Sequence, residues 1–157
     1  MKPVKFHVGN RRLLSLANLL RQVPREHFDF TNWVQDKAPK FEKDAPLKLS
    51  CGTAGCALGW ATSVPALRRA GLKIKIFDED GIGNGKIIGS DIAFHNGDDV
   101  YFGLNAGAAV FGIDFFESSS LFFSRGGERN VTPKQVAKKI ETFVAKRIKD
   151  RNQVSKK

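Results

Sequence analysis

The chain has 157 residues, of which 41% are hydrophobic and 27% charged, and it carries a formal net charge of +10. This length and apolar content favour a packed globular domain and exclude a largely disordered chain. No apolar run approaches the roughly 18–20 residues of a membrane-spanning helix. No secretory signal follows the first residues, so we expect a cytoplasmic protein with reduced thiols.

The first predicted helix covers residues 11–23. Asn10 has a side chain suited to the N-terminal cap, and Pro24 cannot continue the helix. Residues 1–9 are expected to form an extended lead-in. The apolar side chains recur at helical spacing and form one stripe, which consists of Leu13, Leu16, Ala17, Leu20 and Val23.

The uncharged run of residues 50–61 is the most distinctive segment of the sequence, because it combines small residues, both cysteines and Trp60. Small residues let backbones approach closely and the indole fills the remaining space, so the run indicates a buried core. We expect its helix to begin near Ser50 or Thr53 and to run to about Ser63. The predicted core residues are Cys51, Cys56, Gly59, Trp60, Phe111, Leu121 and Phe122.

A change of period follows the central helix. Pro65 is expected to restart the helix and Gly71 to close it. Residues 72–76 alternate apolar and polar side chains, which predicts a strand with one solvated face. Residues 78–85 are rich in turn formers, and residues 86–88 are expected to return as a second strand. The prediction is a small β-hairpin.

Two short helices are predicted next. Asn105 is expected to cap a helix over residues 106–111, which Gly112 ends. Asp114 has the form of a capping box and opens a helix that runs to Phe123. Both helices are rich in apolar and aromatic residues, so we expect them to contribute to the core.

The last predicted helix has the clearest start signal, with Thr132 as the cap, Pro133 as the first helical residue and Gln135 completing a capping box. The segment 134–157 holds seven Lys and two Arg against two acidic residues, a net +7. Such an excess favours an anionic partner, although a merely solvated face is the alternative. The lysines opposite the apolar stripe of this helix are Lys134, Lys138, Lys139, Lys146 and Lys149.

These elements predict a mainly α (α+β) fold. We expect a single globular domain over residues 1–150, in which a small β-hairpin accompanies the helices. A disordered basic tail is expected over residues 151–157.

The cysteines and histidines are the candidates for catalytic and metal sites. Cys51 and Cys56 have nearly the spacing of zinc ligands, but none of His7, His27 and His95 completes a set, so no metal and no cofactor is expected. A disulfide is conceivable, and buried free thiols are the main interpretation. A cysteine at a helix start is also where nucleophiles occur. Cys51, with His95 as base in a strand end or loop, is therefore a candidate catalytic pair.

Several of these segments together resemble a loosely related set of small phage and prophage proteins. In that set a C-G-T-x-x-C-x-x-G-W segment, here within residues 51–61, precedes a phenylalanine-glycine helix and a Leu-Phe pair. The corresponding residues here are 109–113 and 121–122, and the aromatic residues of 28–33 fit as well. The resemblance covers most of residues 13–143, and this sequence departs from it in the lysine-rich C-terminal helix and in the long Gly-rich turn. It implies a source and no activity, so it assigns no functional residue.

Three functions remain open on the sequence. The leading hypothesis is a non-enzymatic phage- or mobile-element-type accessory protein that binds, and could inhibit, a host or phage macromolecule. Binding would use the basic helix or the aromatic region 94–123, and no membrane is involved. The second is weak, sequence-tolerant nucleic-acid binding by the basic helix, because lysine is a poor tool for reading bases. The third is cysteine-dependent hydrolysis.

Overall fold

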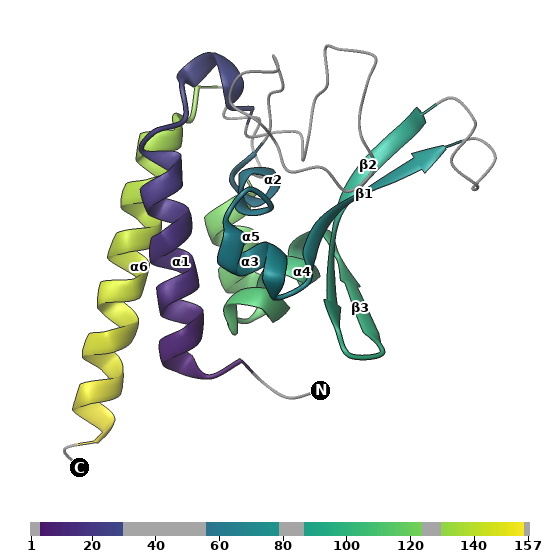
Figure 1. Ribbon diagram of the computed structural model, residues 1–157. Helices are drawn as coiled ribbons and strands as arrows, with labels where there is room; N and C mark the ends of the chain where they lie inside the picture. Colours follow the sequence, from purple (N-terminus) through teal and green to yellow (C-terminus); the bar gives the residue numbers. More distant parts are fainter. Residues whose placement is uncertain (1–3, 30–55, 79–86, 124–129, 156–157) are drawn as a thin grey trace.

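The computed structural model describes residues 4–29, 56–78, 87–123 and 130–155 (Figure 1). The predicted fold class is confirmed, because helices dominate these residues and one small antiparallel sheet accompanies them. In chain order the elements are α1 (Phe6–Leu20), the 3-10 helix η1 (Arg25–His27), α2 (Ala57–Ala61), α3 (Pro65–Arg69), β1 (Leu72–Asp78), β2 (Ile87–Asn96), β3 (Asp99–Phe102), α4 (Gly103–Phe111), α5 (Phe115–Phe122) and α6 (Pro133–Val154).

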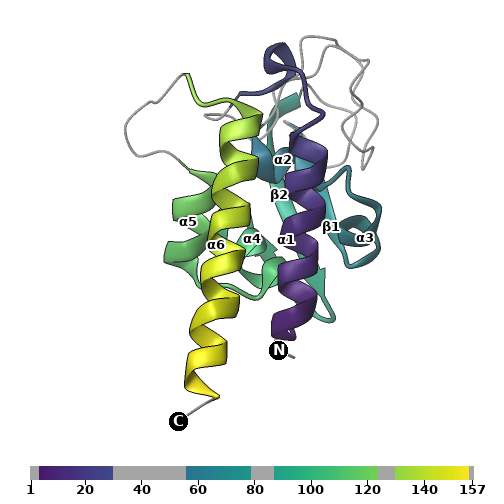
Figure 2. The same ribbon diagram turned by 90° about the vertical axis from the view of Figure 1, so that its left-hand side faces the viewer.

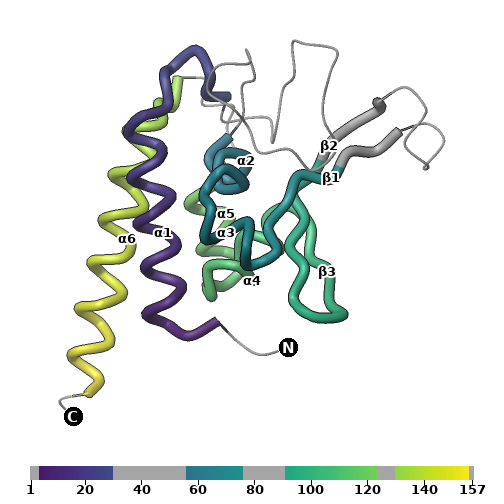
Figure 3. Tube along the Cα trace, in the orientation of Figure 1, coloured from purple at the N-terminus to yellow at the C-terminus, as the bar shows by residue number. Residues whose placement is uncertain are grey.

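The described elements form three layers. Helices α1 and α6 lie side by side and antiparallel in the first layer, although they are far apart in the sequence (Figures 2 and 3). The short helices α2 to α5 form the middle layer, and the sheet lies on its other side (Figure 1). Because the middle layer contacts both α1 and the sheet, the outer surfaces of α6 and of the sheet lie on opposite sides of the protein.

Helix α1 begins earlier and ends earlier than predicted. It starts at Phe6 with no side-chain cap and ends at Leu20, so the expected extended lead-in is wrong for residues 6–9. Asn10 is not a cap. It is buried inside the helix, where its side-chain oxygen accepts a hydrogen bond of 3.0 Å from Arg147 Nη1 of α6. A long-range partner therefore satisfies the polar group that the sequence assigned to a helix end.

The central helix starts later than predicted. Helix α2 begins at Ala57, and the Cys56 thiol caps it by accepting a 3.5 Å hydrogen bond from the amide of Gly59. Thr62 closes it two residues early, because its amide and its hydroxyl both donate to Gly59 O, at 3.1 and 2.7 Å. The predicted starts near Ser50 and Thr53 lie outside the described residues.

The sheet has three antiparallel strands in the order β1-β2-β3, and not the two of a single hairpin. Strand β2 runs to Asn96, so it includes residues 93–96, where a strand end or loop was expected. The missed strand β3 follows a two-residue turn in which Gly97 has φ 65°. Gly97 and Asp98 are the two loop residues, since Asn96 pairs with Asp99, and a glycine at the first loop position is a common hairpin signal.

The later helices follow their capping signals. Helix α4 starts at Gly103, before the predicted cap Asn105, and ends as expected at Gly112, which has a left-handed backbone (φ 61°). The capping box of Asp114 is formed in α5.

Thr132 and Gln135 form the predicted capping box of α6. The helix continues through Arg151 to Val154, so the expected disorder is wrong for residues 151–154.

The buried apolar side chains form one cluster that joins the three layers. Trp60 lies in it with no exposed surface, and its Nε1 donates a 3.0 Å hydrogen bond to His27 O. The rings of Phe111 and Phe122 are 5.4 Å apart between centroids. The predicted core residues that are buried here are Cys56, Gly59, Trp60, Phe111, Leu121 and Phe122. Cys51 lies outside the described residues.

Candidate functional site

The strongest surface feature of the described residues is the solvent side of α6. The opposite side of this helix carries a buried stripe of Val136, Ala137, Ile140 and Val144 that packs against α1 and α5. This stripe fixes the rotation of the helix, because turning it would expose apolar surface. We define the lysine face as the five exposed side chains that this rotation turns outward, which are Lys134, Lys138, Lys139, Lys146 and Lys149.

The acidic residue between these lysines is neutralised. Glu141 forms an ion pair with Arg21 of α1, in which Arg21 Nε and Nη2 donate at 2.9 and 2.6 Å. The hydrogen bonds to Arg21 lower the pKa of Glu141, and those to Glu141 raise the pKa of Arg21. Glu141 therefore leaves the positive charge of the lysine face undiminished.

The lysines differ in what they bind inside the protein. Lys139 Nζ donates a 2.6 Å hydrogen bond to Ser120 O at the end of α5. Within the part of the chain that the structure describes, the other four lysines form no ion pair and no hydrogen bond. These four ammonium groups, which belong to Lys134, Lys138, Lys146 and Lys149, are available to a partner.

The arginines nearby are engaged inside the protein. Arg147 Nη2 donates to Gly112 O at 3.0 Å, and Arg12 Nη1 donates to Val110 O at 2.7 Å. Both carbonyls are at the C-terminal end of α4, where unpaired carbonyls carry partial negative charge. The guanidinium groups of Arg147 and Arg151 also lie 4.9 and 4.5 Å from the centre of the Phe6 ring. The arginines thus hold α6, α1 and α4 together.

The predicted catalytic residues are not brought together in the described part of the chain. His95 is exposed on β2, and Cys51 lies outside the described residues. Cys56 is buried, and burial raises the pKa of its thiol to about 11. A neutral thiol is a poor nucleophile, so Cys56 is suited to packing. Among the described residues no group of three His, Cys, Asp or Glu side chains could hold a metal ion.

We expect Cys56 to resist alkylation in the folded protein. Its raised pKa keeps the thiol neutral at pH 8, and iodoacetamide reacts with the thiolate. In a Cys51→Ser variant, whose remaining thiol is Cys56, mass spectrometry should detect slow modification in buffer and fast modification in urea. Fast modification in buffer would show that the thiol is accessible and ionised.

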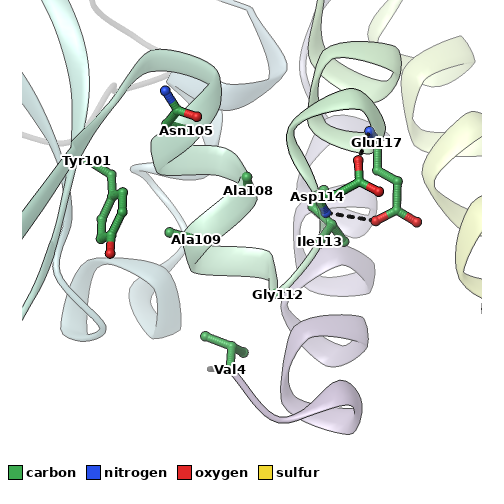
Figure 4. Close-up of a pocket in the computed structure, with 9 residues that line it drawn as sticks. All are labelled: Val4, Tyr101, Asn105, Ala108, Ala109, Gly112, Ile113, Asp114 and Glu117. Atoms are coloured by element: carbon green, nitrogen blue, oxygen red, sulfur yellow. Dashed lines mark hydrogen bonds between the residues drawn. The ribbon is translucent and has the colours of Figure 1, made fainter. Parts of the chain in front are cut away.

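One surface hollow was not anticipated from the sequence. It has a volume of about 380 Å³ and lies between β3, α4 and the start of α5 (Figure 4). Small apolar residues form much of its wall, and Asp114 and Glu117 lie at its rim. The Asp114 carboxylate accepts a 2.7 Å hydrogen bond from the backbone amide of Glu117. The Glu117 carboxylate accepts a 2.9 Å hydrogen bond from the backbone amide of Asp114. The nine lining residues include no Cys, His or Lys, and the ionisable groups among them are Tyr101, Asp114 and Glu117.

No family model, no curated protein and no solved structure matches the chain. The resemblance to phage and prophage proteins therefore stays a prediction. Among the described residues, no helix is both long and apolar enough to cross a membrane. The assignment of a function depends on the chemistry of the exposed side chains.

Proposed function

We propose that the protein acts by binding nucleic acid, and that the lysine face of α6 holds the phosphate backbone. The observation that carries this proposal is the set of four ammonium groups on one side of a helix whose intervening acid is already paired. Lysines are flexible point charges, so they suit contacts with phosphates better than bidentate readout of bases. The binding is accordingly weak and tolerant of sequence.

The dimensions of the lysine face suit a polymer of phosphates. Lys134 and Lys149 are separated by about 22 Å along the helix axis, at a rise of 1.5 Å per residue. Duplex DNA carries one negative charge per about 1.7 Å of its axis, so this length offers several phosphates to each lysine. A helix lying along the backbone can therefore satisfy all four ammonium groups without a fixed register.

The residues between the lysines favour nucleic acid over an acidic protein as the partner. Gln135, Thr142 and Ala145 are the exposed side chains on the same side of α6. They are polar or small, whereas the centre of a protein interface usually contains buried aromatic or arginine anchors. The exposed large apolar residue of α6 between Lys134 and Lys149 is Ile148, which is 43% exposed, and no exposed aromatic side chain lies among the lysines. A surface with this much charge and no aromatic anchor suits a phosphate backbone, which remains hydrated when bound.

The proposal predicts a steep dependence of affinity on salt. If four lysines contact phosphates, the logarithm of the binding constant should fall with the logarithm of salt concentration at a slope of about −3.6. Fluorescence anisotropy of a labelled DNA duplex measures this slope. The fourfold change Lys134→Gln, Lys138→Gln, Lys146→Gln and Lys149→Gln should abolish most of the affinity and bring the slope close to zero. Lys139 is kept because it bonds to Ser120.

Two double variants that remove the same charge from different places test whether the position of the charge, and not the total charge of the protein, sets the affinity. Lys138→Gln with Lys146→Gln should make the slope shallower by about 1.8. Arg68→Gln with Arg69→Gln removes the same charge from exposed positions of α3 and should leave the slope unchanged. Equal effects of the two pairs, or negligible binding by the wild type at low salt, would reject the proposal. Stoichiometric co-purification of a host protein, without affinity for nucleic acid, would favour the accessory-protein hypothesis.

A further inference from the structure

The two faces of the sheet differ sharply in what covers them. Leu72, Ile74, Ile92 and Phe94 are buried on the side that packs against the helices. Because neighbouring residues of a strand alternate, the residues between them face the other side. We call this side the outer sheet face, and its described members are Lys73, Lys75, Asp91, Ala93, His95, Val100 and Phe102.

Large apolar side chains and cations lie together on the outer sheet face. Phe102 is 39% exposed and Val100 is 43% exposed, whereas the solvent side of a sheet usually carries polar residues. The register places Lys73 opposite Ala93, and Ala93 opposite Phe102, so these three residues form one row across the strands. The small side chain of Ala93 separates a cation from an aromatic ring.

The Phe102 ring already accepts a cation. Lys75 Nζ lies 5.3 Å from the centre of this ring. The ring can therefore hold a cation, and because Phe102 is 39% exposed, part of its surface is open to a ligand from the solvent side. Lys73 and Lys75 are two residues apart on β1 and point to the same side, about 7 Å from each other along the strand.

We infer that the outer sheet face binds an unpaired stretch of nucleic acid, with a base stacked on Phe102 and an adjoining phosphate at Lys73. An exposed aromatic ring beside a lysine is a combination with which proteins hold single strands. In a duplex the base faces are covered by their neighbours, so they cannot reach the ring.

This site is spatially separate from the lysine face of α6. The middle layer of helices lies between the sheet and the α1–α6 pair (Figure 1). The inference rests on the proposed function, because both take nucleic acid as the partner. The two sites nevertheless predict different preferences, since the lysine face requires phosphates alone and Phe102 requires an unpaired base.

The test compares two phenylalanine variants with two labelled probes, a thymine-only single strand and a blunt duplex. Phe102→Leu keeps an apolar side chain and removes the ring. It should weaken single-strand binding about 5- to 150-fold, the range for loss of one stacked base, and leave duplex binding unchanged. Phe116→Leu is the matched control, because Phe116 is 76% exposed on α5, and it should affect neither probe. Phe102→Trp should preserve binding of the single strand.

Each other outcome has a definite meaning. Equal behaviour of Phe102→Leu and Phe116→Leu overturns the outer-sheet inference. Wild-type protein that binds the duplex and not the single strand overturns this inference and leaves the α6 proposal standing. Wild-type protein that binds neither probe overturns both. Retention of single-strand binding by the fourfold lysine variant, together with its loss in Phe102→Leu, supports the separate site.

Discussion

Replacing Trp60 with alanine is expected to lower the free energy of unfolding by about 3–5 kcal/mol, as measured by urea denaturation. The indole has no exposed surface and belongs to the cluster that joins the layers. Removing it leaves a cavity in the core. It also removes packing from α2, a five-residue helix that depends on packing for its stability. The substitution also removes the hydrogen bond donor of His27 O.

Trp60→Phe separates the two contributions. Phenylalanine retains most of the buried ring surface and cannot donate to His27 O, so its effect should be clearly smaller than that of alanine. An unchanged urea midpoint for Trp60→Ala would show that residues 56–61 are not the centre of the core. That result would also remove the physical reason for the uncharged composition of this segment.

Gly9→Ala is the second substitution with a large expected effect. A Cβ atom at this position of α1 would lie 2.0 Å from the carbonyl oxygen of Phe111, which belongs to the backbone of α4 and cannot rotate away. Alanine has a helix propensity about 1 kcal/mol more favourable than that of glycine. This gain is opposed by the clash, because α1 and α4 would have to move apart to accept the methyl group. We expect a net loss of roughly 1–3 kcal/mol or more in the free energy of unfolding.

The separation of α1 from α4 would also disturb the arginine contacts beside Gly9. Arg12 of α1 donates to Val110 O of α4, so this bond depends directly on the spacing of the two helices. Arg147 of α6 donates both to Asn10 of α1 and to Gly112 O at the end of α4, so it depends on the same spacing. Asn18→Ala, at an exposed position of the same helix, is the matched control and should leave the urea midpoint unchanged or slightly raised. A Gly9→Ala protein as stable as the wild type would contradict this close approach of backbones.

Local signals in the sequence predicted local features well. The capping boxes of Asp114 and Thr132 and the helix end at Gly112 are formed as expected, because each depends on residues within one turn of the helix. The amphipathic pattern of α6 likewise predicted which side would carry its lysines. That prediction required only the period of the helix and the position of its apolar stripe.

Features that depend on distant contacts were predicted poorly. Asn10 resembles a cap in sequence, but it is satisfied inside a helix by Arg147, which is 137 positions away. Cys56 caps α2 with sulfur, a weak acceptor that is not among the usual capping residues. The outer sheet face was not predicted, because it combines side chains from β1 and β3 and the third strand was missed. The residues of such a site can be grouped only when the register of the strands is known.

The pairing of α1 with α6 has a consequence for the order in which this protein folds. The ion pair between Arg21 and Glu141 joins positions that are 120 residues apart, and the apolar stripe of α1 packs against the same distant helix. During synthesis the stripe of α1 must wait for α6 to leave the ribosome, and until then it is open to chaperones or to other chains. Contacts of such long range slow folding, since a large loop must close before they form. We therefore expect docking of α6 on α1 to be a late step in folding. The same step buries the apolar stripes of both helices and fixes the position of the lysine face.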